Sequence, residues 1–266
     1  MTVDERTRDA LDGSTRRFYR CCADSFSQTR QIPWRGWSEV VRALEQLALE
    51  RQRPLSILDV GCGNLRFERF LLERGVPFSA LCLDRCEALV QAGLESDRRL
   101  SGCCRFCAFD ISPSSLEGLP GLGSFSAVVA FGLLHHIPGR CERAALLKAM
   151  GRCLEPGGLM AVSLWDVDSD ERLSRKAPDD TKAAKELLGL GSLDPGDYVL
   201  GWQSCGGTFR YCHSFSDAEA DELEAEIASE FALRSRYRAD GPSDRSNIYM
   251  LFDKRQTRVP EGGLPL

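Results

Sequence analysis

The stretch Ile57-Leu58-Asp59-Val60-Gly61-Cys62-Gly63-Asn64 decides the fold of this chain. It joins a short apolar run, Leu55–Val60, to an amphipathic segment, Leu65–Arg74, with two glycines at the junction. Glycine tolerates backbone angles that other residues avoid and lets the backbone approach a ligand closely. The pattern therefore predicts a buried strand, a tight turn and a helix, which together begin a doubly wound α/β sheet.

The alternation of strand and helix continues after this turn. Apolar runs typical of buried strands alternate with segments whose apolar residues recur at helical spacing. We expect strands at Phe78–Leu83, Cys104–Phe109, Phe125–Phe131 and Leu159–Trp165, and helices at Arg85–Leu94 and Glu142–Leu154. Right-handed crossovers between such units produce a parallel sheet.

The flanking segments complete the predicted organisation. Residues 1–53 are expected to form an N-terminal helical segment, and residues 54–253 the main domain, with a flexible tail at 254–266. Residues 166–207 are polar, with a short helical stretch at Thr181–Leu188, and are interpreted as a lid over the substrate or a mobile surface insertion. A capping box, Ser216-x-x-Glu219, predicts a helix through Glu230. Strands at Phe231–Arg238 and Asn247–Phe252 then bring the sheet to seven strands.

The composition of the chain limits the functions that can be expected of it. The chain has 266 residues and a formal net charge of −5, so its overall charge does not indicate a nucleic-acid partner. Segments 1–53 and 229–258 are weakly basic. No apolar run approaches the ~18 residues that span a membrane, and the polar N-terminus is unlike a signal peptide. These features predict a cytoplasmic protein without a membrane partner.

Twelve cysteines are present, and reduced thiols are the expectation for such a protein. Cys104 and Cys107 form a CxxC pair, with Cys103 beside it. A zinc site would require a second pair of ligands. The candidates, His135 and His136, belong to another motif, so we expect no metal.

Three acids follow three successive predicted strands. Asp59, Asp84 and Asp110 would meet in the crevice at the carboxyl ends of the strands, where such sheets bind ligands. The glycine turn carries Arg66 where a dinucleotide fingerprint has its third glycine. S-adenosylmethionine (SAM) has no phosphate and does not require that glycine. We therefore assign Asp59 to the cationic methionine end of SAM, Asp84 to the ribose hydroxyls and Asp110 to the adenine amino group.

This pattern resembles the class I SAM-dependent methyltransferases of the type 11-like group. The resemblance rests on ILDVGCGN, on Asp84, and on FGLLHHI followed by LLKAMGRCLEPGGLMAVSLW, over residues 55–165. It implies a Rossmann-like fold, with Gly61, Gly63, Asn64 and Phe131 also at the cofactor. One departure is Leu65, where the family commonly has glycine.

The flanking motifs resemble the tRNA wobble-uridine carboxyl methyltransferases. They comprise Phe26-Ser27-Gln28-Thr29-Arg30, Pro33-Trp34, Leu134-His135-His136, Gly196-Asp197, Gly201-Trp202, Arg210-Tyr211-Cys212-His213-x-Phe215 and Asn247-Ile248-Tyr249. The resemblance implies a carboxymethyl-uridine-type acceptor in tRNA. It also implies a small activator subunit as a partner, since eukaryotic members work with one.

The substrate side contains cations and flat rings. Arg30 and Arg210 offer bidentate binding of a carboxylate, and Trp34 and Trp202 offer faces on which a base can stack. His135 and His136 would shape the pocket near the methyl group or act as a base, and His213 and Asn247 complete the expected substrate site.

Structural interpretations stay open for most of these residues. Arg30 would pair with an acid such as Asp24, the tryptophans would pack in the core or lid, and His213 would orient the next helix. Arg234, Arg236 and Arg238 alternate on a strand, as a phosphate contact or a solvated face. The functional alternatives are a methyltransferase of a small molecule (a quinone, a lipid or a secondary metabolite) and a SAM-sensing module without turnover.

Overall fold

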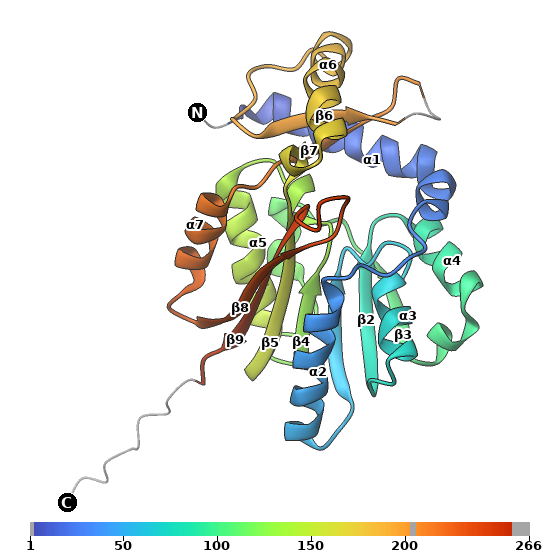
Figure 1. Cartoon of the computed structure of the whole chain (residues 1–266), viewed down its shortest axis with the longest axis vertical. Helices are drawn as coiled ribbons and strands as arrows, with labels where there is room; N and C mark the ends of the chain where they lie inside the picture. Colours follow the sequence, from blue (N-terminus) through green and yellow to red (C-terminus); the bar gives the residue numbers. More distant parts are fainter. Residues whose placement is uncertain (1–2, 203–205, 257–266) are drawn as a thin grey trace, which may run out of the picture.

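The computed structural model describes residues 3–202 and 206–256, and it is built around one seven-stranded sheet (Figure 1). The strand order is β3-β2-β1-β4-β5-β9-β8. The first five strands in this order, β3, β2, β1, β4 and β5, run parallel to one another. Strand β9 is antiparallel to both β5 and β8. The strands are β1 (Leu55–Val60), β2 (Phe78–Asp84), β3 (Cys104–Ala108), β4 (Phe125–Ala130), β5 (Leu154–Trp165), β8 (Phe231–Ala239) and β9 (Asn247–Lys254). The predicted doubly wound, mostly parallel, seven-stranded sheet is confirmed.

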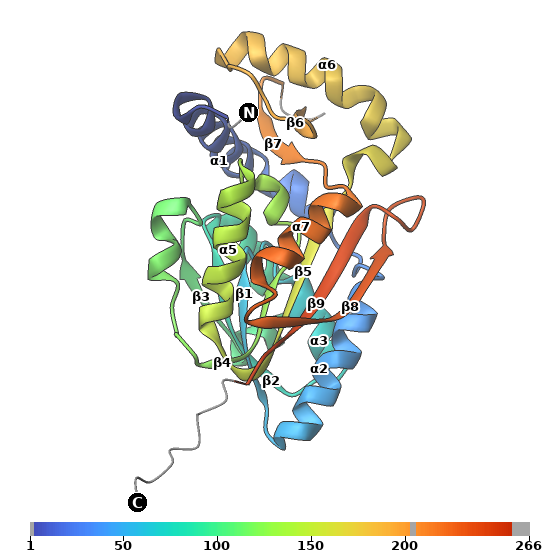
Figure 2. The same cartoon turned by 90° about the vertical axis from the view of Figure 1, so that its left-hand side faces the viewer.

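Helices lie on both faces of this sheet (Figure 2), and the core lies between them and the sheet. Because side chains alternate along a strand, Leu58 and Val60 of β1 enter one cluster and Leu55 and Ile57 enter the other. Every residue of β4 is buried, as a central strand covered on both faces requires. The covering helices are α5 (Arg140–Cys153) and α7 (Asp217–Ile227) on one face, and α2 (Trp37–Arg51), α3 (Arg66–Glu73) and α4 (Glu87–Ser96) on the other.

Several element boundaries differ from the sequence prediction. The capping box at Ser216 and Glu219 forms in both directions, but the helix it begins ends at Ile227 rather than Glu230. Strand β5 begins at Leu154 instead of Leu159, because the Pro-Gly-Gly segment is part of the strand. The register of the pairing between β4 and β5 shifts at this segment.

A separate cap covers the carboxyl ends of the strands. It consists of α1 (Glu5–Gln28), α6 (Glu171–Leu188) and a hairpin of β6 (Asp197–Gly201) and β7 (Phe209–His213), seen at the top of Figure 2. The helix predicted at Thr181–Leu188 is present, but it is the last part of a longer helix. The helix begins at Glu171, where the Asp170 carboxylate caps the free amides of its first turn, and it accommodates Pro178.

Short helical turns connect the main elements. They are η1 (Arg98–Gly102), η2 (Pro113–Gly118), η3 (Leu134–His136) and η4 (Val167–Ser169). The expected flexible tail falls mostly on residues 257–266, which lie outside the described residues. In the part of the chain that is described, no helix is both long and apolar enough to span a membrane.

Candidate active site

A cavity of about 970 Å³ lies between the carboxyl ends of the strands and the cap. The turns after β1, β2 and β4 contribute to its wall, as do α1 and β7. Most of the residues assigned from the sequence line it: Arg30, Trp34, Asp59, Gly61, Gly63, Asn64, Asp84, Phe131, His135, His136, Arg210 and Asn247. The fold therefore brings together residues that are far apart in the sequence.

The glycine turn forms one end of the cavity. Gly61 and Gly63 have φ angles of 83° and 56°, in the region that favours glycine. A side chain on Gly63 would meet no atom within 4 Å, so the turn presents open space to a ligand. Leu65 also adopts a left-handed φ of 55°, which explains why glycine is common there in the resembled family.

Asp84 and Asp59 supply the acceptors beside this turn. The Asp84 carboxylate accepts hydrogen bonds from the amides of Gly63 and Cys86, at 2.8 and 2.7 Å. Burial raises the pKa of Asp84, and these amides oppose the rise. Burial, with Glu68 close by, also raises the pKa of Asp59 well above its usual range. Oδ1 of Asp59 is buried without a hydrogen-bond partner among the described residues.

These features fit SAM. An unsatisfied buried carboxylate oxygen calls for a donor such as an ammonium group. Asp84 retains acceptor capacity for ribose hydroxyls, since each carboxylate oxygen offers about two lone-pair sites. The open space at Gly63 allows a ligand to approach the backbone.

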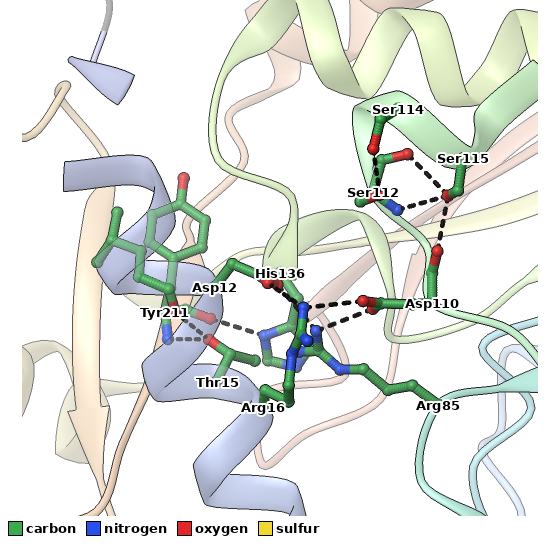
Figure 3. A network of polar contacts seen from close by, with 11 residues as sticks. Asp12, Thr15, Arg16, Arg85, Asp110, Ser112, Ser114, Ser115, His136 and Tyr211 are labelled. Carbon is green, nitrogen blue, oxygen red and sulfur yellow. Dashed lines mark hydrogen bonds and ion pairs between the residues drawn. The ribbon is translucent and has the colours of Figure 1, made fainter. Parts of the chain in front are cut away.

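The assignment of Asp110 is corrected by the structure. Its carboxylate binds Arg16 at 2.8 Å and Arg85 at 3.3 Å, and both arginines also bind Asp12 of α1 (Figure 3). Asp110 is therefore occupied by ion pairs and does not line the cavity. At this end the wall is formed instead by Phe109, Ile111, Ser112 and Ser114.

Arg30 and Arg210 are the two cations of the expected substrate site, and both line the cavity. The Arg210 guanidinium stands over four aromatic rings at 5.1 to 5.7 Å, from Phe18, Phe26, Trp165 and Trp202. Arg30 stands over the Phe26 ring at 5.0 Å, and it does not pair with Asp24. Burial and the nearby Arg210 lower the pKa of Arg30. Two cations thus share an aromatic surrounding with no ion pair to any acid of the described chain.

His135 and His136 are both neutral at physiological pH. Burial and the neighbouring His136 lower the pKa of His135 well below its usual range, and burial lowers that of His136 to about 3. With Cys212 they form a group of metal-ligand types within 4.8 Å, the one such group in the described residues. Both ring nitrogens of His136 already have partners, Tyr19 and the Tyr211 carbonyl. The expectation of a metal-free site therefore stays a prediction.

Two substrate assignments are corrected. Trp202 does not line the cavity: it packs edge-on against Phe18 at 5.8 Å and donates to the Ser25 hydroxyl at 3.1 Å. His213 is buried between two carboxylates, with Asp197 at 2.7 Å and Glu219 at 2.6 Å. Trp202 thus packs in the cap, and His213 contacts Glu219 in the first turn of α7, which were the structural alternatives for the two residues.

The three arginine side chains of strand β8 likewise form ion pairs within the chain. Arg234 binds Asp253, whereas Arg236 and Arg238 bind acids of α7 and of the turn after β5. These side chains are therefore committed to intramolecular contacts, which disfavours the phosphate contact.

Tyr19, Arg66 and Trp165 are among the lining residues that the sequence analysis did not assign to the site. The Arg66 guanidinium stacks on Trp34 at 4.9 Å and on Trp37 at 5.0 Å. Its position directly after the glycine turn, as a cation beginning a helix, was a signal that could have identified it. Tyr19 and Trp165 gave no comparable signal, since each stands in an ordinary apolar pattern.

The comparisons with known proteins agree with this geometry. The family described as a methyltransferase domain matches residues 29–213, more than half of the chain. A putative methyltransferase of Encephalitozoon cuniculi is 29% identical over 205 residues, covering 75% of this chain and 79% of that protein.

Two further relatives name their acceptors. The mouse tRNA (carboxymethyluridine(34)-5-O)-methyltransferase ALKBH8 is 23% identical over 173 residues, covering 64% of this chain and only 23% of that protein. The trans-aconitate 2-methyltransferase of an Acidovorax strain is 33% identical over 125 residues, covering 47% of this chain and 44% of that protein.

A solved structure shares the fold along almost the whole chain. The 1,6-didemethyltoxoflavin-N1-methyltransferase of Burkholderia thailandensis, with bound S-adenosylhomocysteine, superposes with a TM-score of 0.59 at 17% identity. The match covers 94% of this chain and 91% of that one. Together with the family match and the site geometry, it leads to one conclusion: this chain belongs to the methyltransferase domain family and is a class I, SAM-dependent methyltransferase.

Proposed function

We propose that this enzyme methylates a carboxylate, and that the acceptor is a carboxymethyl-uridine-type nucleoside at the wobble position of tRNA. The observation that carries the proposal is the pair Arg30 and Arg210. Both guanidiniums line the cavity, both lack an ion pair with any described acid, and burial and the nearby Arg210 lower the pKa of Arg30. An anionic group of the substrate would compensate these charges, and a guanidinium matches a carboxylate in a bidentate geometry.

A carboxylate acceptor also suits the neutral histidines. When bound, SAM supplies an electrophilic methyl group on a sulfonium, and transfer is an in-line displacement that depends on orientation. A carboxylate is already an anion near pH 7, so no base is required. The chain's task is then to hold the acceptor with Arg30 and Arg210 and to exclude water with the surrounding rings.

Two features favour tRNA among carboxylate acceptors. The mouse relative acts, by its name, on carboxymethyluridine 34 of tRNA. The cavity wall also includes Arg172, a cation suited to a nucleic-acid backbone, whereas Arg35 pairs with Asp244 at 2.6 Å. The predicted partners are therefore tRNA, in the cytoplasm, and a small activator subunit of the kind used in the resembled family.

The alternative acceptor is a small molecule. The trans-aconitate methyltransferase relative acts, by its name, on a small polycarboxylate, which also demands cationic groups. Carboxylate methylation is common to both acceptors, so the two proposals differ in the body of the substrate and agree on the role of Arg30 and Arg210.

The test is incubation of the purified protein with methyl-labelled SAM and total RNA from a strain lacking the gene. We expect label in tRNA that mild alkali releases, as a methyl ester requires. Alkali-stable label would move the acceptor to a base or ribose. Label in a metabolite extract but not in RNA, with and without an activator, would favour the small-molecule alternative.

An Arg30→Ala variant then tests the site itself. We expect a large loss of methyl transfer to the acceptor with little change in SAM affinity. Unchanged transfer by this variant would show that Arg30 does not bind the acceptor.

A further inference from the structure

The hydroxyl of Tyr19 lies against a histidine in the wall of the cavity. Tyr19 is on α1, and its oxygen is 2.7 Å from Nε2 of His136. Its ring is held edge-on between Phe18, at 5.1 Å, and Phe26, at 5.2 Å. The phenol therefore has one well-defined direction, and it points across the cavity wall from the cap to η3.

The tautomer of His136 follows from its second partner. Nδ1 of His136 is 2.6 Å from the carbonyl oxygen of Tyr211. A carbonyl can only accept a hydrogen bond, so Nδ1 must carry the proton. Because the ring is neutral, Nε2 has no proton and accepts. The Tyr19 hydroxyl is therefore the donor, and its proton is directed at His136.

Helix α1 also contacts the backbone amide of Tyr211. The Tyr211 amide donates to the Thr15 hydroxyl at 3.0 Å (Figure 3). Thr15 and Tyr19 are four residues apart and so lie on one face of α1. That face consequently fixes both backbone polar groups of Tyr211, one directly and one through His136. The residue fixed in this way is the neighbour of Arg210 on β7.

The oxygen of Tyr19 is left with only acceptor capacity. The Arg210 guanidinium is the cation beside it: burial raises the pKa of Tyr19, and Arg210 works against that rise. A guanidinium has donors and no acceptor, so it complements an oxygen whose proton is already used. The hydrogen bonds thus run in one direction, from Tyr19 through His136 to the Tyr211 carbonyl. The Arg210 guanidinium stands at the start of this chain, over the rings of Phe18 and Phe26 that flank Tyr19.

We propose that Tyr19 is a positioning residue that, together with His136, holds the Arg210 guanidinium in the orientation that binds the acceptor carboxylate. This inference rests on the proposed function, since it concerns how the anion is recognised. Tyr19 acts through Arg210 and does not take part in the transfer itself. His136 has no free nitrogen, so it serves the same positioning role and is not a base.

The first experiment replaces Tyr19 with phenylalanine. Tyr19→Phe keeps the ring and removes the hydroxyl, so we expect kcat/KM for the acceptor to fall about 10- to 100-fold, the usual effect of losing an outer partner. The Kd for S-adenosylhomocysteine should stay unchanged. Tyr198→Phe is the matched control: it removes a cap hydroxyl that donates to Asp168 at 2.8 Å but does not line the cavity. Equal effects of the two substitutions would overturn the proposal.

Two variants of His136 separate positioning from mere packing. His136→Gln places an amide oxygen near the position of Nε2, where it can accept from Tyr19. His136→Asn places an amide near Nδ1, where it can bond only to the Tyr211 carbonyl. Positioning through Tyr19 predicts that the glutamine variant retains more activity than the asparagine variant. The opposite order would show that only the Tyr211 contact matters.

A third measurement does not depend on the acceptor. The chain has three histidines, so their ring nitrogens can be resolved by ¹⁵N NMR. We expect His136 to carry its proton on Nδ1 in the wild type and in Tyr19→Phe, because the Tyr211 carbonyl accepts that proton in both. The Nε2 resonance should shift in Tyr19→Phe, because Nε2 loses its hydrogen-bond donor. A wild-type proton on Nε2 would overturn the inference whatever the activity. If no carboxylate is methylated but the proton is on Nδ1, the proposed function fails while the hydrogen-bond chain stands.

Discussion

Asp84 accepts a hydrogen bond from the backbone amide of Gly63 at 2.8 Å, which joins the end of β2 to the glycine turn after β1. Its other oxygen accepts from the Cys86 amide at 2.7 Å. The carboxylate therefore does two things at once. It holds the turn in its left-handed conformation, and it keeps one further lone pair on each oxygen for a ligand hydroxyl.

Asp84→Asn should weaken the binding of S-adenosylhomocysteine. The amide keeps one acceptor, but its NH₂ group would face the Gly63 or Cys86 amide, donor against donor. Losing hydrogen bonds to a charged group costs about 1.5–3 kcal/mol, which corresponds to a Kd roughly 10- to 100-fold higher. Isothermal titration calorimetry measures this Kd. Asp97→Asn, at a partly exposed acid paired with Arg99 outside the cavity, is the control, and an effect of similar size there would contradict the assignment.

Two glycines with similar backbone angles allow a matched test of the turn. Gly63 and Gly75 have φ angles of 56° and 72°, and a side chain on either would meet nothing within 4 Å. Alanine at both positions should cost about 1–2 kcal/mol of unfolding free energy, because both are left-handed. Only Gly63→Ala should also weaken SAM binding, by at least about 10-fold, since its methyl group would occupy the ligand's space. Equal SAM affinity in the two variants would rule out close approach of the ligand at Gly63.

Local patterns were sufficient to predict the sheet, since apolar residues predominate in each strand of the parallel core and fill the central part of β4 without interruption. The β6–β7 hairpin escaped prediction because its residues mix polar and apolar types and become buried only when it packs against α1 and α6. The long helix α6 escaped because Pro178 is read as a helix breaker. Its proline is tolerated in an exposed helix whose start is fixed by the Asp170 cap.

Site residues could be predicted where a local sequence motif fixes their position. They could not be predicted where their role depends on contacts with residues far away in the sequence. Asp59 and Asp84 follow strands of the glycine-turn motif and line the cavity. Asp110 follows a strand in the same way, but Arg16, which lies 94 residues away in the sequence, takes its carboxylate. No single-sequence pattern indicates that pairing. For the same reason Tyr19 was missed, because its role depends on His136 across the fold.

The buried group of Asp197, His213 and Glu219 should make stability depend on pH. Burial alone would lower the pKa of His213, but its hydrogen bonds to the two carboxylates outweigh burial and raise it. A raised folded-state pKa means that the stabilisation is complete below about pH 6.5 and is lost as the pH rises through the higher, folded-state pKa. The free energy of unfolding of the wild type should therefore fall in that range relative to His213→Asn.

At acidic pH, Glu219 makes the free energy of unfolding depend on pH in the opposite direction. The His213 contact and the Ser216 amide overcome burial and lower the pKa of Glu219 from 4.5 to about 2. Its stabilisation is present above pH 4.5 and is lost as the pH falls toward 2. Comparing urea unfolding of wild type and His213→Asn cancels the contribution of His135 and His136, whose pKa values are lowered. A constant difference between the two proteins from pH 6 to 8 would show that His213 is not charged in the native state.

Arg66 provides the last prediction, because its guanidinium lines the cavity directly after the glycine turn. Its Nη1 donates to the Ile32 carbonyl at 3.0 Å, and its Nε is buried without a partner in the described structure. A cation placed there matches the methionine carboxylate of SAM. Arg66→Met should raise the Kd for S-adenosylhomocysteine about 10- to 100-fold, as expected for a charge-assisted pair, and leave the Kd for 5′-methylthioadenosine, which lacks the carboxylate, unchanged. Equal weakening of both ligands would instead mean that the variant disturbs the Trp34 and Trp37 packing, and an unchanged Kd for both would place Arg66 with the acceptor.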